Sequence, residues 1–213
     1  MGGWADGRSW HLIVDPVGRS GEYNMTTDET LLADVAGRGG AYLRLYRWDP
    51  PTLSVGRNQP NAFQGVPFVR RPTGGQAVWH DQEVTYAVVA PVERFGSLRK
   101  AYCDIHARLA NALRALGVDA LFAPAHPPLR PSAHPSCFAA PIGGEILVNG
   151  KKLVGSAQVR RGNAFLQHGS ILLDGSQEPV TGGRGATTLR AVLGRTVTFE
   201  EVTAIIIEKW EER

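Results

Sequence analysis

The sequence is poor in cysteine, in long apolar runs and in clustered charge, and each of these absences excludes a class of protein. Its 213 residues include only two cysteines, Cys103 and Cys137. Two widely separated thiols provide neither a disulfide framework nor the paired spacing of a zinc site. Free thiols persist in a reducing compartment, so we expect a cytoplasmic protein.

Signals for a membrane or for secretion are missing as well. No apolar run approaches the roughly 18 residues that suggest a membrane-spanning helix. The opening sequence M-G-G-W-A-D-G-R lacks the apolar core of a secretion signal. Asp6 stands where a myristoylation motif needs serine or threonine. The sequence therefore predicts a protein that does not associate with membranes.

Charge is modest and dispersed along the chain. Charged residues make up 20% of the sequence, and the formal net charge is +3. Such an excess permits an acidic protein partner, but it does not indicate nucleic-acid binding. Hydrophobic residues make up 43% of the chain, which suits one globular domain with a substantial core. We therefore expect residues 1–213 to form a single domain.

The most informative stretch runs from Cys137 to Gln158 and reads C-F-A-A-P-I-G-G-E-I-L-V-N-G-K-K-L-V-G-S-A-Q. Asn149-Gly150 between two apolar runs predicts a two-residue type I′ hairpin. This turn sets three cross-strand pairs, Val148 with Lys151, Leu147 with Lys152 and Ile146 with Leu153. Lys152 then lies between apolar neighbours, where a lysine needs a partner or a chemical task.

A structural role for these two residues is the alternative. Cys137 could be a small packed residue, and Lys152 could extend its amine to solvent. The segment 124–141 carries six prolines and two histidines, which predicts a long loop of the kind that forms lids. His134 in this loop is a weak candidate for a base beside Cys137. Cys103 falls in a helix predicted over 97–116, where we expect a packed thiol and, at His106, a surface histidine.

A second polar cluster lies within Phe68–Pro91, which reads as strand, glycine loop, strand and strand. Two adjacent glycines permit positive φ and leave backbone open to a ligand. An ordinary hairpin with solvated arginines is the alternative, but arginines before the loop and a His-Asp pair after it favour a ligand cradle. The cradle residues are Arg70, Arg71, Gly74, Gly75, Gln76 and His80.

Hydrophobic periodicity places the remaining elements. We predict strands over 10–14, 41–47, from 52 to 55 and over 164–173, and helices over 24–36, 188–193 and 198–210. Thr26 and Glu29 form a capping box for the first of these helices, and Thr198 with Glu201 caps the last. His168-Gly169-Ser170 interrupts the strand 164–173, which indicates a bulge or one wall of a site.

With these motifs in hand, the chain resembles the biotin/lipoate protein ligase and lipoyl-transferase family. The resemblance rests on N-M-T-T-D-E-T-L-L, Y-R-W-D-P-P-T-L-S-V-G-R-N-Q, R-R-P-T-G-G-Q-A-V-W-H-D, V-N-G-K-K-L-V-G-S-A-Q and L-Q-H-G-S-I-L-L, and covers nearly the whole chain. It implies an α+β fold in which a mixed, largely antiparallel sheet is flanked by helices.

Within that family the chain looks most like the cysteine-dependent octanoyltransferases. Those proteins keep an acyl-carrying thiol near the position of Cys137, and Lys152 matches the family lysine before V-G-S-A. Gln76 replaces the third loop glycine that is usual in ATP-dependent lipoate ligases. The resemblance implies octanoyl transfer from acyl carrier protein to a lysine of a lipoyl domain or of the glycine-cleavage carrier protein, without a cofactor or metal.

Three alternatives remain open at this stage. They are a lipoate ligase that uses ATP and magnesium, a lipoyl or octanoyl amidotransferase, and a non-catalytic acyl-binding protein. For the transferase, the resemblance implies Cys137 and Lys152 as catalytic residues, with the Lys152 ammonium lowering the thiol pKa from about 8.5. The implied substrate-binding residues are Arg70, Arg71, Gly74, Gly75, Gln76, His80, Gly155, Ser156, Ala157 and His168. Backbone N–H groups over 155–157 are candidate oxyanion donors.

Overall fold

A computed structural model describes residues 9–60, 63, 65–124, 144–181 and 185–211 of the chain. Its larger sheet has the strand order β1-β2-β6-β10-β9-β8-β7. The bounds in that order are His11–Arg19, Tyr42–Trp48, Glu83–Pro91, Ala164–Leu172, Lys151–Arg161, Ile146–Val148 and Leu121–Phe122. Only β1 and β2 pair in parallel, and the other neighbours are antiparallel. The predicted mixed, largely antiparallel α+β fold is therefore confirmed.

A smaller sheet packs beside the larger one. It consists of β4 (Phe68–Arg70), β3 (Thr52–Val55) and β5 (Val78–His80), with β3 in the middle. Because β4 and β5 each pair with β3 and not with each other, the glycine loop between them is not a hairpin turn. The loop instead crosses over the end of β3, which brings its glycines beside the residues that follow that strand.

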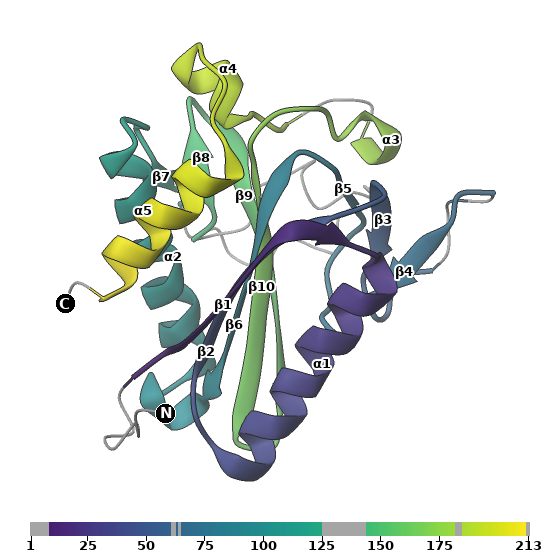
Figure 1. Cartoon of the computed structure of the whole chain (residues 1–213), viewed down its shortest axis with the longest axis vertical. Coiled ribbons are helices and arrows are strands. Elements are labelled where there is room, and N and C mark those ends of the chain that lie inside the picture. Colours follow the sequence, from purple (N-terminus) through teal and green to yellow (C-terminus); the bar gives the residue numbers. More distant parts are fainter. Residues whose placement is uncertain (1–8, 61–62, 64, 125–143, 182–184, 212–213) are drawn as a thin grey trace.

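Helices cover both faces of the large sheet (Figure 1). The helix α1 (Gly21–Arg38) lies on one face, and α2 (Leu98–Ala115) and α5 (Phe199–Glu211) lie side by side on the other. Three short helical segments, η1 (Val92–Arg94), α3 (Glu178–Thr181) and α4 (Leu189–Leu193), complete the fold. None of the helices within the described ranges combines the length and apolar character needed to cross a bilayer.

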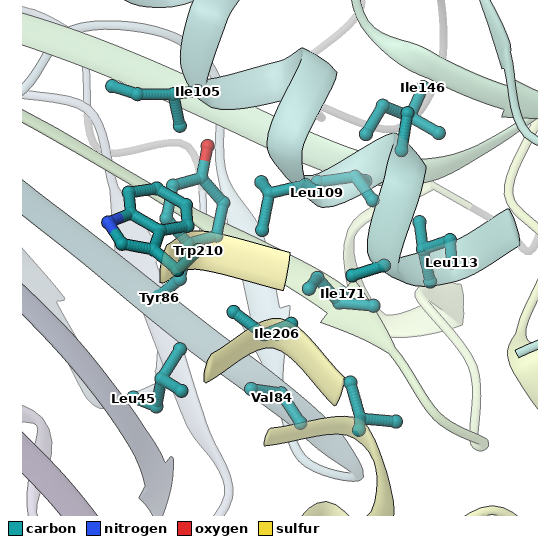
Figure 2. Packing of buried hydrophobic residues seen from close by; sticks show 14 of the residues in the cluster. Leu45, Val84, Tyr86, Ile105, Leu109, Leu113, Ile146, Ile171, Ile206 and Trp210 are labelled. Carbon is teal, nitrogen blue, oxygen red and sulfur yellow. The ribbon is translucent and has the colours of Figure 1, made fainter. Parts of the chain in front are cut away.

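The strand β6 divides the core because its side chains alternate between the two faces. Val84 and Tyr86 point to the α2 and α5 side, whereas Ala87 and Val89 point to α1. Figure 2 shows Leu109, Ile171 and Ile206 packed together on the first side. Burial of each such aliphatic side chain contributes roughly 1.5–3 kcal/mol, so both helical layers hold the central strands firmly.

The first helix begins earlier than its sequence predicts. Ser20 is the N-cap, and its hydroxyl accepts a hydrogen bond from the backbone N–H of Tyr23 at 3.2 Å. Thr26 and Glu29 therefore lie inside α1, and the capping-box prediction was wrong. Ser20 caps the helix six residues before Thr26, so Thr26 lies in the second turn, where no free N–H group needs a cap. Ser97 caps α2, and the predicted cap of α5 by Thr198 is present.

The Asn149-Gly150 turn forms the predicted hairpin, with φ of 50° and 73° at its two residues. Val148 pairs with Lys151 and Leu147 pairs with Lys152, as the turn type requires. The third predicted pair was wrong, because Ile146 faces Val154 instead of Leu153. A bulge between Ile146 and Leu147 shifts the register by one residue.

Two expectations for the long helix α2 were also wrong. Cys103 is exposed, and His106 is completely buried. The buried side of α2 includes Ile105, His106 and Leu109, so it extends further around the helix than the aliphatic stripe alone. Cys103 lies on the opposite side, facing solvent.

Candidate active site

A cavity partly open to solvent lies where the small sheet meets the middle strands of the large one, with about 360 Å³ of empty space when the open solvent at its mouth is included. Its wall includes six residues expected from the sequence, namely Arg71, His80, Gly155, Ser156, Ala157 and His168. The predicted polar interruption of β10 is one wall of this cavity, and its pairing with β6 and β9 continues without a register shift. Gly169 and Ser170 of that interruption also line the cavity, whereas sequence reasoning did not identify the remaining lining residues, Met25, Tyr46, Trp48, Ser54, Val78 and Thr85.

Arg71 connects the cavity to the glycine loop. One guanidinium nitrogen, Nη2, donates to the carbonyl oxygens of Gly74 at 2.9 Å and Gln76 at 2.6 Å. The other, Nη1, donates to the hydroxyl of Ser54 at 3.2 Å. Arg71 is only 5% exposed, so these contacts fix both the guanidinium and the loop. Gly74, Gly75 and Gln76 shape the site through Arg71, because they are not among the described residues that line the cavity.

Arg70 has a different task from the one expected of a ligand cradle. Its side chain is largely exposed and is not among the described lining residues of the cavity. It donates to the backbone carbonyls of Gly56, Arg57 and Gln59 at 2.7–3.1 Å. Arg70 therefore braces the turn that follows β3.

That turn approaches the glycine loop closely at one glycine that the sequence did not single out. A Cβ atom at Gly56 would lie 2.0 Å from the carbonyl oxygen of Gly75. Gly75 itself has φ of +87°, a conformation that residues with a side chain rarely adopt. The close passage of the two backbones requires glycine at position 56, and the positive φ of the loop favours glycine at position 75.

Asp28 organises a buried polar group around the cavity. Its carboxylate accepts hydrogen bonds from Arg44 at 3.0 Å, from the Tyr46 hydroxyl at 3.0 Å and from His168 Nδ1 at 2.9 Å. The other nitrogen of His168, Nε2, accepts from the Thr73 hydroxyl at 2.7 Å. Desolvation by burial lowers the pKa of His168 although Asp28 opposes this effect, so the ring is neutral at pH 7. His168 thereby ties the glycine loop to α1.

His80 belongs to a second buried group. Its Nδ1 lies 2.8 Å from Glu83 Oε1, and its Nε2 lies 2.7 Å from the Ser54 hydroxyl. The ring stacks on Trp48 with a centroid distance of 3.9 Å. Because Glu83 fixes one nitrogen and Ser54 the other, His80 presents a rigid wall to the cavity.

Lys152 points into the protein as the hairpin register predicts, and its side chain forms an ion pair with Glu145. The Nζ–Oε1 distance is 2.5 Å, and both residues are 1% exposed. Lys151, one position nearer the turn, is exposed. Sequence reasoning found Lys152 but missed Glu145, which lies one residue before β8 in the same hairpin.

The predicted nucleophile Cys137 falls in the segment 125–143, outside the described residues, together with His134. The roles assigned to them remain predictions. Within the described part of the chain, no cluster of three or more His, Cys, Asp or Glu side chains has the geometry of a metal site.

The missed polar residues share a recognisable pattern. Asp28 lies four residues before Leu32, on the buried side of an amphipathic helix, and both are buried. Arg44 occupies an inward position of β2 next to Tyr46 on the same face. A charged residue at an apolar position of a periodic segment is the signal that could have identified them.

The sequence has relatives among named proteins. A protein from Kyrpidia tusciae named Octanoyltransferase LipM is 40% identical over 96% of this chain and 87% of its own length. The Bacillus subtilis protein of the same name is 39% identical over 78% of this chain and 66% of its own length.

Solved structures with this fold are more distant in sequence. Lipoate-protein ligase A, solved with bound ATP, superposes with a TM-score of 0.73 at 22% identity, covering 94% of this chain and 84% of that one. The archaeal bipartite ligase from Thermoplasma acidophilum gives 0.68 at 20% identity, with coverage of 96% and 84%. The lipoyl protein ligase A/B catalytic domain family matches residues 20–211. The chain therefore belongs to the lipoyl protein ligase A/B catalytic domain family.

Proposed function

We propose that this chain is a protein octanoyltransferase. It moves an octanoyl group from acyl carrier protein through a thioester on Cys137 to a lysine of a lipoyl domain or of the glycine-cleavage carrier protein. The observation that carries the proposal is the 40% identity to a relative named Octanoyltransferase LipM over 96% of this chain. The reaction needs a free thiol, an acyl pocket and a cation near the sulfur, and the residues of this chain supply candidates for all three.

The surface of the cavity suits an acyl chain. Met25, Trp48 and Val78 give its wall an apolar character, and Gly155 and Ala157 leave room beside β9. The polar groups that line it, Arg71, His80 and His168, are already engaged by protein partners. An aliphatic chain therefore enters without depriving these side chains of their hydrogen-bond partners.

The mechanism proceeds in two transfers. In the first, the Cys137 thiolate attacks the carrier thioester, a new C–S bond forms, and the carrier thiolate leaves. In the second, the acceptor amine attacks the octanoyl-Cys137 carbonyl, a C–N bond forms, and the C–S bond breaks, with the amine proton passing to the departing sulfur. Thioester exchange is nearly balanced in free energy and amide formation is downhill, so the proposed reaction requires neither ATP nor magnesium.

Lys152 and the backbone of β9 are proposed to stabilise the negative charges that arise in the reaction. An ammonium near Cys137 favours the thiolate and lowers the thiol pKa. The Glu145 carboxylate pairs with this ammonium and holds it in one position. Backbone N–H groups over 155–157 are the proposed donors to the oxyanion that forms in each transfer.

The test is the intact mass of the protein after incubation with octanoyl-acyl carrier protein in the absence of ATP. We expect one octanoyl adduct that hydroxylamine removes, and transfer of the group to an added lipoyl domain. Cys137→Ser should lose both, whereas Cys103→Ser, which changes an exposed helical thiol, should keep both. If the wild type forms no adduct but modifies the lipoyl domain with free lipoate, ATP and magnesium, the ligase alternative holds instead.

A further inference from the structure

One end of the molecule carries four exposed cations. Arg160 and Arg161 are the last residues of β9, and Arg99 and Lys100 lie in the first turn of α2. None of the four forms an ion pair with a carboxylate of the described residues. We call these four residues the basic face.

The two parts of the basic face are adjacent in the fold although they are distant in sequence. The Gln158 side chain, which shares a face of β9 with Arg160, donates to the Leu98 carbonyl at 3.3 Å. Arg160 pairs with Phe165 of β10, and the Phe165 ring packs edge-on against Phe95, just before α2. The end of β9 and the start of α2 therefore form one continuous surface.

Folding concentrates at this end a positive charge that is dispersed along the sequence. The segments 91–100 and 158–164 together contain five cations and a single anion, Glu93. The fifth cation, Arg94, lies over the Trp10 ring and is only partly exposed. The formal net charge of the whole chain is +3, so the excess on these two segments exceeds that of the entire protein. Neighbouring cations reinforce one another's field, which attracts an acidic surface.

The distance between the basic face and the cavity indicates which partner it fits. Arg161 lies four residues along β9 from Ala157 on the cavity wall, a separation of roughly 13 Å at about 3.3 Å per residue. A lipoyl-domain lysine has a short side chain, so the acceptor must dock at the mouth of the cavity. The octanoyl donor is a small acidic protein that carries its thioester on a much longer phosphopantetheine arm. Its body can therefore dock further away.

Resting on the proposed octanoyltransferase function, we infer that the basic face docks the acidic acyl carrier protein while the arm of that protein delivers the octanoyl group to the cavity. Charge complementarity of this kind acts mainly on the encounter of the two proteins, and salt weakens it. The basic face is not among the described residues that line the cavity, so its charges act on docking and not on the chemistry of transfer.

The test compares loading from two donors, octanoyl-acyl carrier protein and octanoyl-pantetheine, of which only the first has a protein surface. In Arg160→Glu/Arg161→Glu, the concentration of the protein donor that gives half-maximal loading should rise by roughly tenfold or more, while the maximal rate stays within about twofold. Loading from octanoyl-pantetheine should stay within about twofold of wild type, because it does not need the basic face. Added salt should weaken the use of the protein donor by the wild type.

Two further variants control for folding and for net charge. Arg99→Glu/Lys100→Glu should weaken use of the protein donor in the same way. It should also fold at least as stably as wild type, because acidic side chains in the first turn of a helix interact favourably with its dipole. Arg190→Glu/Arg195→Glu changes the net charge equally at two exposed arginines on and after α4, beside the opposite end of β9, and should alter neither donor. Thermal unfolding checks that each variant folds.

The exposed thiol of Cys103 allows docking to be measured directly. Cys103 follows Arg99 and Lys100 by four and three residues in α2, so it lies on the same side of the helix. In Cys137→Ser it is the only cysteine. A photoreactive benzophenone attached to it should cross-link to acyl carrier protein, and adding the Arg160→Glu/Arg161→Glu reversal should abolish the cross-link.

The possible outcomes are distinct. Unchanged half-maximal loading in both reversals, or an equal rise in the α4 control or with octanoyl-pantetheine, overturns the inference and leaves the octanoyltransferase proposal standing. If the reversals instead weaken transfer to the lipoyl domain alone, the basic face serves the acceptor and the inference is wrong. Absence of an octanoyl adduct on the wild type from either donor overturns both proposals.

Discussion

Glu145 Oε1 lies 2.5 Å from Lys152 Nζ, and both side chains are shut away from solvent. The ammonium proposed to act on Cys137 therefore has a carboxylate partner within the same hairpin. Separating such a pair removes a favourable charge–charge contact from a medium of low dielectric. The pair thus contributes to the structure and also fixes the position of the ammonium that is proposed to act in catalysis.

Glu145→Gln should destabilise the fold by about 3–5 kcal/mol, because it leaves the Lys152 ammonium buried without its counter-charge. Chemical denaturation measured by circular dichroism gives the free energy of unfolding. Lys151→Ala is the matched control, since it removes an exposed lysine next in sequence, and should stay within about 0.5 kcal/mol of wild type. An unaltered unfolding free energy in Glu145→Gln would show that the pair contributes little.

Lys152→Ala should raise the apparent pKa of Cys137 and slow its acylation. Removal of the ammonium takes away a stabilising charge, and the Glu145 carboxylate that remains would oppose the thiolate further. The double variant Lys152→Ala/Glu145→Gln should recover part of the shift, because it removes both charges. The rate of thiol alkylation in a Cys103→Ser background, measured against pH, reports this pKa. Superimposable profiles for all variants would remove Lys152 from the proposed role.

Gly75→Val should reduce octanoyl loading at least tenfold while the protein remains folded. The position has φ of +87°, and an added Cβ would lie 3.1 Å from Arg71 Nη2, so the guanidinium on the cavity wall must move. Gly74→Ala is the control, since a Cβ there meets no atom of the described residues within 4 Å. Loading is followed by intact mass, and a folded Gly75→Val protein that loads at the wild-type rate contradicts this prediction.

Stability should fall as the pH is lowered through the range from about 6.5 to about 4. Burial lowers the pKa of His106 to about 4, so in this range the unfolded chain binds a proton that the folded chain does not. Acid therefore favours unfolding, and His106 lowers the free energy of unfolding by up to roughly 3 kcal/mol over this range. His168 adds to the effect in the same direction. Thermal unfolding at a series of pH values should show a shallower slope for His106→Asn than for wild type.

Local chemistry explains which parts of the structure were predictable. The Asn149-Gly150 turn determines its own geometry and the two nearest pairs, so the inward position of Lys152 followed from a few adjacent residues. The bulge at Ile146 could not be predicted in this way, because no residue of the turn signals a shift in register. His168 was recognised as a polar interruption, but its partner Asp28 lies 140 residues away in sequence. That contact depends on how α1 packs on β10, which local patterns do not specify.

The same reasoning applies to the histidine of α2. His106 differs from its aliphatic neighbours only in being polar, so periodicity placed it at the surface. Its burial is stabilised by hydrogen bonds to Gly144 and Ser156, from two segments far along the chain. These partners come into place only after β9 has joined the sheet, so the burial of His106 is determined by the tertiary structure and not by the local sequence.

The place of β6 in the sheet has a consequence for the order in which the protein assembles. β6 is buried along nearly its whole length, and its neighbour β10 pairs with every one of its residues. The ribosome releases β6 well before β10, so the nascent chain carries an apolar strand with one open edge for that interval. Pairings between segments so distant in sequence form slowly, which exposes the half-made chain to association with its own copies. We expect chaperone binding and aggregation to compete with folding chiefly in this interval, until β10 closes that edge.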